Sequence, residues 1–364
     1  MINQLLHRLI KHIDSFLMAC LLFTMLVGLF VLYSASGHSI DRVLAQAINI
    51  AVALSAMWLA SNVSPQHIER AALPLYILGV LLLIFVALFG TTSHGATRWL
   101  NLGITKIQPS EIMRLAMPMM IAWYFSKREA SLRIVDFVIA AMLLVVPVGL
   151  IMKQPDLGTA LLISASGFYV LFLAGLNWKF LLGGIVSVGA MMPVFWSMLH
   201  DYQRKRIEIL IDPTQDPLGA GYHTIQATIA LGSGGIAGKG WLHGTQAQLD
   251  FLPERTTDFI FAVFGEEFGM LGNILLLVLF SLIIIRGLII AADAKDTFTR
   301  LLAGSITLTF FTYTFVNMGM VSGILPVVGV PLPFISYGGT SMVTLLLGFG
   351  ILMSIHTHKK LVSS

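Results

Sequence analysis

The sequence predicts an all-α polytopic membrane protein with about ten transmembrane helices. Hydrophobic residues make up 57% of the 364 residues and charged residues only 11%, against roughly 25% charged in an ordinary soluble domain. Apolar runs recur from one end of the chain to the other, each long enough to cross about 30 Å of hydrocarbon as a helix. Helices satisfy their own backbone hydrogen bonds, which lipid cannot do. We therefore expect a single integral membrane domain over residues 1–364.

Taken in order, the apolar runs place the predicted spans. The first half of the chain gives Ser15–Tyr33, Val43–Ala60, Ala72–Phe89, Pro109–Phe125 and Ile134–Met152. The second half gives Leu157–Gly175, Phe180–Leu199, Ile260–Ile285, Leu301–Gly319 and Ser341–Ile355. The first run is longer than the apolar core of a secretory signal, so we interpret it as a retained span. The single cysteine, Cys20, excludes an intrachain disulfide and is expected to pack within that span.

The distribution of basic residues predicts that both termini are cytoplasmic. Lys and Arg gather in the N-terminal segment, in every second connection and at the C-terminus. The short connections on the other side hold few: Arg42, Arg98, Lys106 and Lys153. This orientation places a large loop, residues 200–258, outside the membrane between the seventh and eighth spans. Long loops in compact proteins are usually functional or disordered, and this one is not of low complexity, since it includes a stretch, Ile225–Gly235, that we expect to form a short helix on the membrane.

The stretch Phe251–Gly269 concentrates acidic residues at the start of the eighth span, among them Asp258, Glu266 and Glu267. Ionisable groups are costly beside hydrocarbon and are functional candidates for that reason. Asp258 is the best candidate for a general base, because partial burial raises the pKa of a carboxylate towards neutrality. The alternative is that Asp258 only caps the helix that follows. Glu266 and Glu267 are adjacent, so we expect them to face different surroundings, one shaping a cavity and the other meeting a partner or a headgroup.

Other polar residues cluster on the predicted outer side. Glu111 and Arg114 are spaced to lie on one face of a helix, either as a structural ion pair or in contact with substrate. Asp156 opens the sixth span, where a helix cap is the alternative to a binding role. The run Arg204–Arg206 and the glycine-rich segment around Lys239 suit phosphate groups, or lipid headgroups. The glycine-rich segment lacks the P-loop spacing, and neither zinc-binding nor serine-hydrolase motifs are present.

Five long motifs together resemble one family, the SEDS proteins of shape, elongation, division and sporulation. In chain order they are GATRWLNLG with QPSE, KQPDLGTALL, DPLGAGYHTIQATIALGSGGIAGKG, GTQAQLDFLPERTTDFIFAVFGEEFG and GILPVVGVPLPFISYGGTS. The resemblance covers essentially the whole chain. The form of the fourth motif, the short termini and the ending SIHTHKK resemble the family's elongation branch more than its division branch.

The resemblance implies a peptidoglycan glycosyltransferase that polymerises lipid II at the outer face of the bacterial inner membrane. It also implies a class B penicillin-binding protein as partner, which supplies the crosslinking transpeptidase, and a place in the elongation machinery. The essential loop aspartate of the family matches Asp258, its QPSE glutamate matches Glu111, and the basic residue that follows matches Arg114. Many relatives have His where this chain has Thr256, and Lys in place of Arg114. The first difference argues against a catalytic histidine here, and the second changes the geometry of a charged contact.

The expected reaction joins a growing glycan on undecaprenyl pyrophosphate to the 4-hydroxyl of lipid II, with inversion at the anomeric carbon. We expect Asp258 to be catalytic, and the leaving pyrophosphate to be stabilised by basic side chains or by a divalent metal, Mg or Mn. No nucleic acid partner is expected. The substrate-binding candidates are Glu111, Arg114, Arg98, Lys106, Lys153, Asp156, Lys239, Arg204, Arg206, Glu254 and Arg255.

Two other classes of function remain open at the level of sequence. The first is a transporter that flips lipid II, because many spans and intramembrane charges suit that activity as well. The second is a scaffold without catalytic activity that only docks a division or elongation partner. The charges gather at the outer ends of spans instead of near the midplane, and this favours the enzyme. A polymerase of the division branch is the nearest enzymatic alternative.

Overall fold

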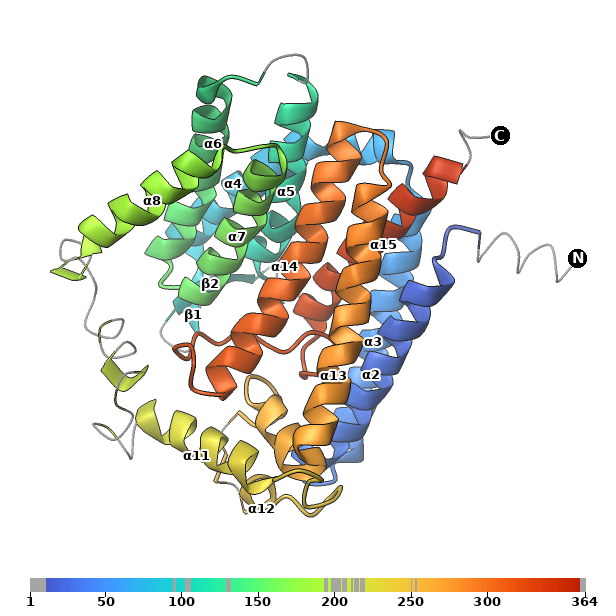
Figure 1. Ribbon diagram of the computed structural model, residues 1–364, viewed down its shortest axis with the longest axis vertical. Helices are drawn as coiled ribbons and strands as arrows, with labels where there is room; N and C mark the ends of the chain where they lie inside the picture. The colour runs from blue at the N-terminus through green and yellow to red at the C-terminus, as the bar shows by residue number, and fades with distance from the viewer. Residues whose placement is uncertain are drawn as a thin grey trace, which may run out of the picture.

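The structure, a computed structural model, describes residues 11–360 apart from 94–95, 102–105, 129–131, 193–195, 198–203, 205–207, 211, 213–215, 217–219, 250 and 253. Each predicted span overlaps one helix; these helices form a bundle, except α8 (Trp178–Ala190), which extends away from it (Figure 1). The helices of the first half are α2 (Ser15–Ala35), α3 (Ile40–Ser61), α4 (Pro65–Phe89), α5 (Pro109–Ser126) and α6 (Ile134–Lys153). Those of the second half are α7 (Leu157–Leu173), α8 (Trp178–Ala190), α13 (Ile260–Ala292), α14 (Thr297–Val321) and α15 (Gly339–Lys360).

Within the described part of the chain, seven helices are long and apolar enough to cross a membrane: α2, α3, α4, α6, α13, α14 and α15. Helix α7 is apolar but shorter. Helix α5 carries Glu111 and Arg114 near its start and is largely buried among its neighbours. The chain is therefore a multi-pass helical membrane protein, and ten as the number of spans stays a prediction.

A small antiparallel sheet follows α4, which the sequence did not lead us to expect. It consists of β1 (Thr91–Ser93), β2 (Ala96–Asn101) and β3 (Lys106–Ile107). The strands pair in the order β1–β2–β3, with Leu100 opposite Ile107. This sheet brings β2 against the ends of α4 and α5 and so fixes the position of Arg98.

Helix α14 forms the centre of the bundle. It packs against α13, α7 and α5, and it runs through the middle of the molecule in Figure 1. Most of its residues are buried, including several Thr residues and Asn317. A largely buried helix with polar side chains must satisfy them inside the protein, so α14 is the element on which polar contacts from other segments converge.

The outer connections lie at the end of the bundle opposite the two termini (Figure 1). Helix α11 (Ala220–Ser233) runs across this end, which confirms a helix in this part of the large loop, and the short helix α12 (Thr245–Gln248) follows. The connection between α14 and α15, residues 322–338, contains no long helix or strand and folds against the turn that precedes α13. These connections surround the start of α13.

Helix α13 is broken at Gly269, which has φ 64° and ψ −161°. This backbone conformation is accessible to glycine almost alone. The glycine-rich segment after α11 passes through the break: Met270 N donates to Gly235 O at 2.9 Å, and Gly240 N donates to Glu267 O at 3.0 Å. A Cβ atom on Gly269 would lie 2.3 Å from the backbone N of Gly238. The glycines of this segment therefore allow its backbone to lie directly against the backbone of α13 at the break.

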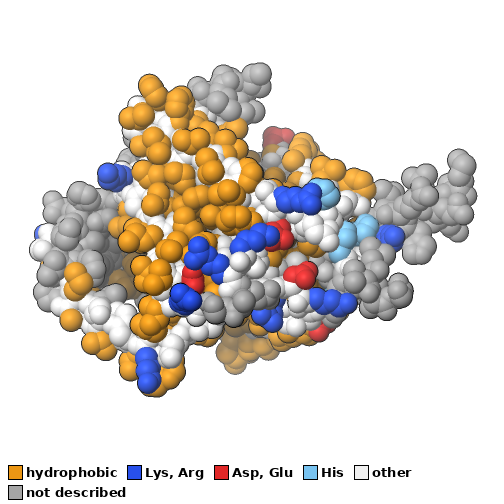
Figure 2. Space-filling model, turned by 90° about the horizontal axis from the view of Figure 1, so that it is seen from above, with side chains coloured by type: hydrophobic (Ala, Val, Ile, Leu, Met, Phe, Trp, Pro, Cys, Tyr) orange, Lys and Arg blue, Asp and Glu red, His pale blue; other side chains and the backbone are white. Residues whose placement is uncertain are grey.

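The end that carries the termini holds ion pairs between helices. Arg286 of α13 bonds to Asp14 at 2.5 Å, and Lys127 bonds to Glu69 at 2.9 Å. Arg128 pairs with Asp136 in the same region. Figure 2 shows this end of the molecule, where Lys and Arg side chains gather around the helix ends. This is the end that the sequence predicts to face the cytoplasm, and that orientation stays a prediction.

Candidate functional site

Asp258 lies in a tight turn just before α13. Glu254 begins the turn with φ 49°, and its carbonyl accepts hydrogen bonds from Thr257 N at 3.1 Å and Phe259 N at 3.3 Å. The N-cap of α13 is Phe259, with no side-chain capping bond. The alternative that Asp258 acts as the helix cap is therefore wrong, and its carboxylate is not used to satisfy the start of α13.

The backbone of this turn is held at three successive carbonyl groups. Asn317 Nδ2 of α14 donates to the carbonyl of Asp258 at 2.9 Å. From the α14–α15 connection, Ser336 Oγ donates to the Thr257 carbonyl at 2.6 Å and Tyr337 N to the Thr256 carbonyl at 2.8 Å. These three hydrogen bonds fix the turn through its backbone carbonyls. The side chain of Asp258 is therefore available for chemistry.

The surroundings of Asp258 favour its neutral form more than water does. Burial raises the pKa of Asp258 to about 6, with a further contribution from the negative charge of Glu254. The positive charge of Arg98 acts in the opposite direction. A carboxylate with a pKa near neutrality is suited to accept a proton from a hydroxyl group, so the sequence-based expectation for Asp258 agrees with its environment.

A cavity of about 380 Å³ lies between α11 and the α14–α15 connection, and it approaches the Asp258 turn through His223, which contacts Phe259. It is lined by His223 and Thr224 of α11 and by Leu325–Val327 of the α14–α15 connection. The ring of His223 stacks on Phe259 at 5.8 Å between centroids. Burial lowers the pKa of His223, so this ring is neutral at physiological pH. The cavity offers an uncharged wall next to the Asp258 turn.

Two ion pairs join candidate residues, and the Arg98 of the first one acts on Asp258. Arg98 Nε is 3.2 Å from Asp156 Oδ2, and the Arg98 side chain is 36% exposed, so it is open to solvent on one side. Asp156 also caps α7, accepting a hydrogen bond from Thr159 N at 3.2 Å. The capping alternative for Asp156 is therefore confirmed, and the same carboxylate orients Arg98.

The second ion pair joins Glu111 and Arg114 on one face of α5. Arg114 Nη1 donates to Glu111 Oε2 at 2.7 Å, and the two side chains are 12% and 10% exposed. The guanidinium lies over the ring of Tyr313 of α14, with Cζ 5.3 Å from the centroid. The expected spacing on one helix face is confirmed, and the buried pair is held against the central helix.

The remaining candidate residues are less closely gathered. Lys153 is exposed at the end of α6, and Arg255 donates to the carbonyl of Ala247. Arg204 donates to the carbonyls of Trp196 and Ser197 at 3.0 and 2.9 Å. Lys106 lies in β3, but its side chain is outside the described part of the structure, as is Arg206. The described contacts of Lys153, Arg204 and Arg255 do not include the Asp258 carboxylate, and the predictions for Lys106 and Arg206 stay untested.

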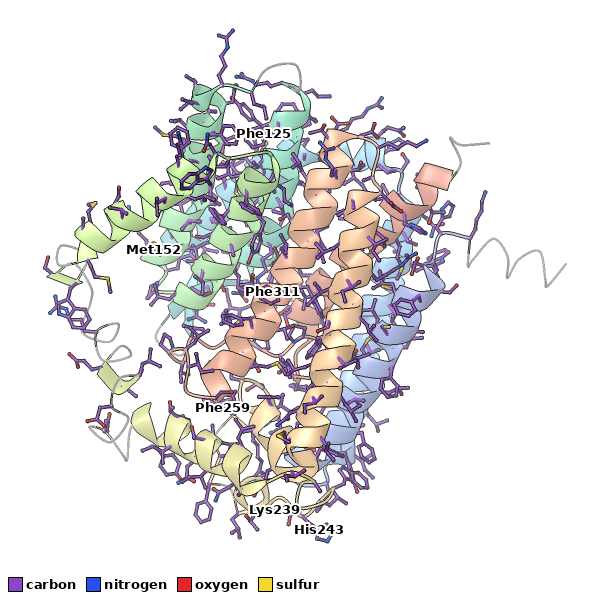
Figure 3. All side chains as sticks on the ribbon, viewed as in Figure 1. Phe125, Met152, Lys239, His243, Phe259 and Phe311 are labelled. Carbon is purple, nitrogen blue, oxygen red and sulfur yellow. The ribbon has the colours of Figure 1, made fainter. Side chains whose placement is uncertain are left out.

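Lys239 is held in a junction with Glu266. Its Nζ is 2.7 Å from Glu266 Oε1 and 2.8 Å from Thr245 Oγ1. The fully buried Glu266 carboxylate also accepts hydrogen bonds from the backbone N of Thr245 at 2.9 Å and of Gln246 at 3.1 Å. Figure 3 places Lys239 at the outer extremity of the molecule, beyond Phe259. These bonds tie the start of α12 to α13.

Glu267 contributes to the same junction. Its buried carboxylate accepts a hydrogen bond from Ser34 of α2, and a Cβ atom on Gly244 would lie 3.0 Å from Glu266 Oε2 and 3.3 Å from Glu267 Cγ. The expectation that the two glutamates face different surroundings is therefore wrong. The backbone of the connection from α11 to α12 passes close to both of them at once.

Three residues that hold the Asp258 turn were not predicted from the sequence: Asn317, Ser336 and Tyr337. Asn317 had a detectable signal, because an asparagine inside an apolar span requires partners within the protein. Its Nδ2 donates to Val330 O at 2.6 Å as well as to Asp258 O. Ser336 and Tyr337 lie in a segment of prolines and glycines, where the sequence alone does not indicate which carbonyl they contact.

A metal site made of protein side chains alone is not formed by the described residues, among which no group of three or more His, Cys, Asp or Glu side chains is close enough to hold an ion. Asp258 and Glu254 are the two neighbouring carboxylates. Mg²⁺ is commonly bound through one or two carboxylates together with substrate phosphates. A divalent ion, Mg or Mn, thus stays a prediction for the substrate complex.

The sequence matches the family described as "Cell cycle protein" (FTSW_RODA_SPOVE) over residues 14–361. It is 50% identical over 353 residues to peptidoglycan glycosyltransferase MrdB of Escherichia coli, which covers 97% of this chain and 95% of the relative. The fold is similar to a chain solved in a study of polymerisation and crosslinking by a peptidoglycan synthase complex, with a TM-score of 0.83, 30% identity and coverage of 95% and 98%. It is also similar to the rod shape determining protein RodA of Thermus thermophilus, with a TM-score of 0.72, 27% identity and coverage of 94% and 96%.

Proposed function

Because this chain belongs to the FtsW, RodA and SpoVE family of cell cycle proteins, we propose that it polymerises lipid II into glycan strands for cell elongation and rod shape. The chain is a peptidoglycan glycosyltransferase, the activity in the name of a relative with which it shares half its residues over almost the full length. The observation that carries the mechanism is the Asp258 turn, with its fixed backbone and its raised pKa.

In the proposed reaction, Asp258 is the general base. It accepts the proton of the 4-hydroxyl of the GlcNAc residue of lipid II while that oxygen attacks the anomeric carbon of the growing glycan. The new C–O bond forms as the bond from the anomeric carbon to the pyrophosphate oxygen breaks, so undecaprenyl pyrophosphate leaves and the configuration inverts to a β-1,4 link. Three hydrogen bonds to the backbone of the turn keep the carboxylate in position.

The leaving pyrophosphate needs positive charge, and Arg98 is the described residue best placed to supply it. Its guanidinium is partly exposed, is oriented by Asp156 and acts on the pKa of Asp258. A guanidinium can bind two phosphate oxygens at once. Lys239 is already bonded to Glu266 and Thr245, and Arg204 to two carbonyl groups. We therefore rank Arg98 first among the proposed pyrophosphate contacts.

The site is proposed to face the periplasm, with both termini in the cytoplasm. The Asp258 turn lies at the end of the bundle opposite the termini, and basic side chains surround the helix ends on the terminal side (Figures 1 and 2). Lipid II carries its sugars on the outer leaflet after it is flipped. The isoprenoid tails of donor and acceptor would then lie along the apolar helices.

A class B penicillin-binding protein is the proposed partner, together with the elongation machinery. The support is the similarity to a chain from a peptidoglycan synthase complex that couples polymerisation and crosslinking. Exposed apolar side chains along α13, such as Leu275 and Val278, leave a face of that helix open to lipid or to another transmembrane helix. The partner would supply the transpeptidase, which forms the peptide crosslinks.

The decisive experiment measures polymerisation of labelled lipid II by the purified protein with its partner, for the wild type and for Asp258→Asn. We expect glycan polymer from the wild type only, with equal membrane insertion and partner binding for both proteins. Polymer from both proteins would remove Asp258 as the base. Movement of lipid II across vesicles without polymer from either protein would establish the flippase in place of the enzyme.

A further inference from the structure

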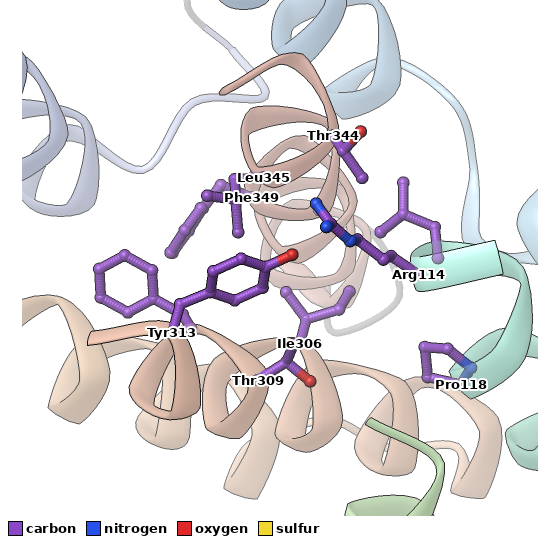
Figure 4. A pocket seen from close by; sticks show the side chains of 11 residues that line it. Arg114, Pro118, Ile306, Thr309, Tyr313, Thr344, Leu345 and Phe349 are labelled. Carbon is purple, nitrogen blue, oxygen red and sulfur yellow. The ribbon is translucent and has the colours of Figure 1, made fainter. Parts of the chain in front are cut away.

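A small chamber lies behind the Glu111–Arg114 pair, between α5, α14 and α15. Its volume is about 30 Å³. Its polar lining comes from Arg114, Thr309, Tyr313 and Thr344, and the other walls are apolar. Figure 4 shows the guanidinium of Arg114 and the hydroxyl of Tyr313 directed towards each other across this space.

Three buried atoms of residues that line the chamber have no hydrogen bond of standard geometry among the described residues: Arg114 Nε, Thr309 Oγ1 and Tyr313 OH. The Arg114 guanidinium and the Tyr313 hydroxyl interact with each other directly, but this contact leaves Arg114 Nε and part of the hydroxyl's capacity unused. Tyr313 is 1% exposed, Thr309 9%, and the Arg114 side chain 10%. Leaving a buried donor or acceptor unpaired costs about 1–3 kcal/mol, and more for a charged group. Three such atoms around one chamber indicate a shared hydrogen-bonding ligand.

The size of the chamber and its polar lining suit water. A cavity needs roughly 10–15 Å³ of space for the centre of a water molecule to hold one water, and the water needs two to four polar partners. The chamber, with about 30 Å³ and the polar groups of Arg114, Thr309 and Tyr313, satisfies both conditions for one or two water molecules.

We propose that this chamber is a water-binding site and that Tyr313 is a positioning residue for the Glu111–Arg114 pair. Water bonds to Arg114 Nε, to the Tyr313 hydroxyl and to Thr309 Oγ1, while the Tyr313 ring supports the guanidinium from the side. With those donors satisfied, Nη1 of Arg114 stays directed at Glu111 Oε2, 2.7 Å away. This inference rests on the proposed function, because the Glu111–Arg114 pair is a substrate-binding candidate whose effect is measured through lipid II polymerisation.

The position of Tyr313 on α14 explains why this contact matters for polymerisation. Thr309, Tyr313 and Asn317 follow one another at intervals of four residues, so they lie on one face of the helix. Asn317 binds the carbonyl of Asp258, and Tyr313 lies one turn away, about 6 Å along the helix axis. One face of α14 therefore contacts both the Glu111–Arg114 pair and the backbone of Asp258, and it fixes the position of one relative to the other.

The first test compares Tyr313→Phe and Thr309→Val with a matched control, Thr312→Val. Thr312 is on the same helix and is also buried, but its hydroxyl bonds to Tyr169 at 2.7 Å, away from the chamber. We expect Tyr313→Phe to lower kcat for lipid II polymerisation about tenfold with KM nearly unchanged. Thr309→Val should lower kcat less, and Thr312→Val should leave it unchanged. Full kcat in Tyr313→Phe would overturn the proposal.

A double-mutant cycle separates positioning from a general loss of packing. In an Arg114→Met background, adding Tyr313→Phe should cause no further loss of kcat, because the group that Tyr313 positions is already gone. If Tyr313→Phe lowers kcat equally in the wild type and in Arg114→Met, Tyr313 acts only on the stability of the fold. Full activity of Arg114→Met alone would instead remove this pair from the proposed function.

A direct readout of the chamber does not depend on activity. An experimental structure that resolves ordered solvent should show water bonded to both Arg114 and Tyr313 in the wild type, and fewer waters there in Tyr313→Phe. A dry chamber in the wild type would overturn the water site, even if polymerisation proceeds as proposed.

Discussion

Asp258 and Glu266 lie in the same short segment, yet their carboxylates have opposite surroundings. Glu266 is fully buried and bonds to Lys239, to Thr245 and to two backbone amides. Asp258 is partly buried, and the hydrogen bond from Asn317 goes to its backbone carbonyl, not to its carboxylate. The charges of Glu254 and Arg98 shift the pKa of the carboxylate without a hydrogen bond to it. The comparison teaches that burial of an acid does not by itself indicate catalysis. A carboxylate whose hydrogen bonds are all made inside the protein holds the fold, and one with a raised pKa that takes no part in the contacts holding its turn is available to react.

The largest expected effect is on catalysis by Asp258→Asn. Asparagine keeps the size of the side chain but cannot accept the proton, so polymerisation should fall by about 10²–10⁴-fold. The melting temperature should not decrease, because the three bonds that hold the turn use backbone carbonyls. Gel analysis of labelled glycan together with a melting curve checks both parts. A large drop in the melting temperature would mean that Asp258 also holds the fold.

Glu266→Gln should show the reverse pattern. The change leaves Lys239 without its counter-charge and weakens the acceptor for two buried amides, so we expect a loss of stability of about 2–3 kcal/mol. Chemical or thermal unfolding in detergent measures it, with the exposed Glu208→Gln as the matched control. Activity per folded molecule should stay close to that of the wild type. If Glu266→Gln is as stable as the wild type, the junction does not hold the fold.

Gly269→Ala tests the backbone crossing beside Glu266. The positive φ angle and a Cβ atom only 2.3 Å from Gly238 N should together cost about 2 kcal/mol or more of stability. Gly149→Ala in α6 is the matched control, because a Cβ atom there meets nothing within 4 Å. That control should be neutral or slightly stabilising. Equal melting temperatures for the two variants would contradict the described break in α13.

The smallest expected effect is on the pH dependence of the wild type. With a pKa of about 6, Asp258 is ionised and active as a base at pH 7, and the rate should fall about tenfold by pH 5. Because this pKa is raised on folding, the group stabilises the fold below its ordinary pKa, and that contribution is lost as the pH rises through about 6. A flat rate profile between pH 5 and 7 would count against Asp258 as the base.

The sequence predicted most of the bundle, because each span is a long apolar run that must form a helix in lipid. It did not predict the small sheet, since short strands in a polar loop have no comparable signal. It did not predict the break at Gly269 either, because a glycine in an apolar run is ordinary until another backbone crosses it. The bounds of α13 and α14 also extend beyond the predicted spans at one or both ends.

The candidate site was predicted in part. Asp258 and the pair Glu111–Arg114 stood out because charges are rare in this chain. The sequence singled out Asp258 but did not predict the structural role of Glu266, because that role depends on Lys239 and on the start of α12. Asn317 and Tyr313 are distant from Asp258 and Arg114 in sequence, and only the fold shows that α14 carries both contacts.

The most direct test of the account measures Asp258→Asn and Glu266→Gln side by side in two assays, lipid II polymerisation and thermal unfolding. The account predicts that Asp258→Asn loses polymerisation and keeps its melting temperature, while Glu266→Gln loses melting temperature and keeps its activity per folded molecule. The opposite assignment, or the same loss in both assays for both variants, would contradict the separation of a reacting carboxylate from a structural one.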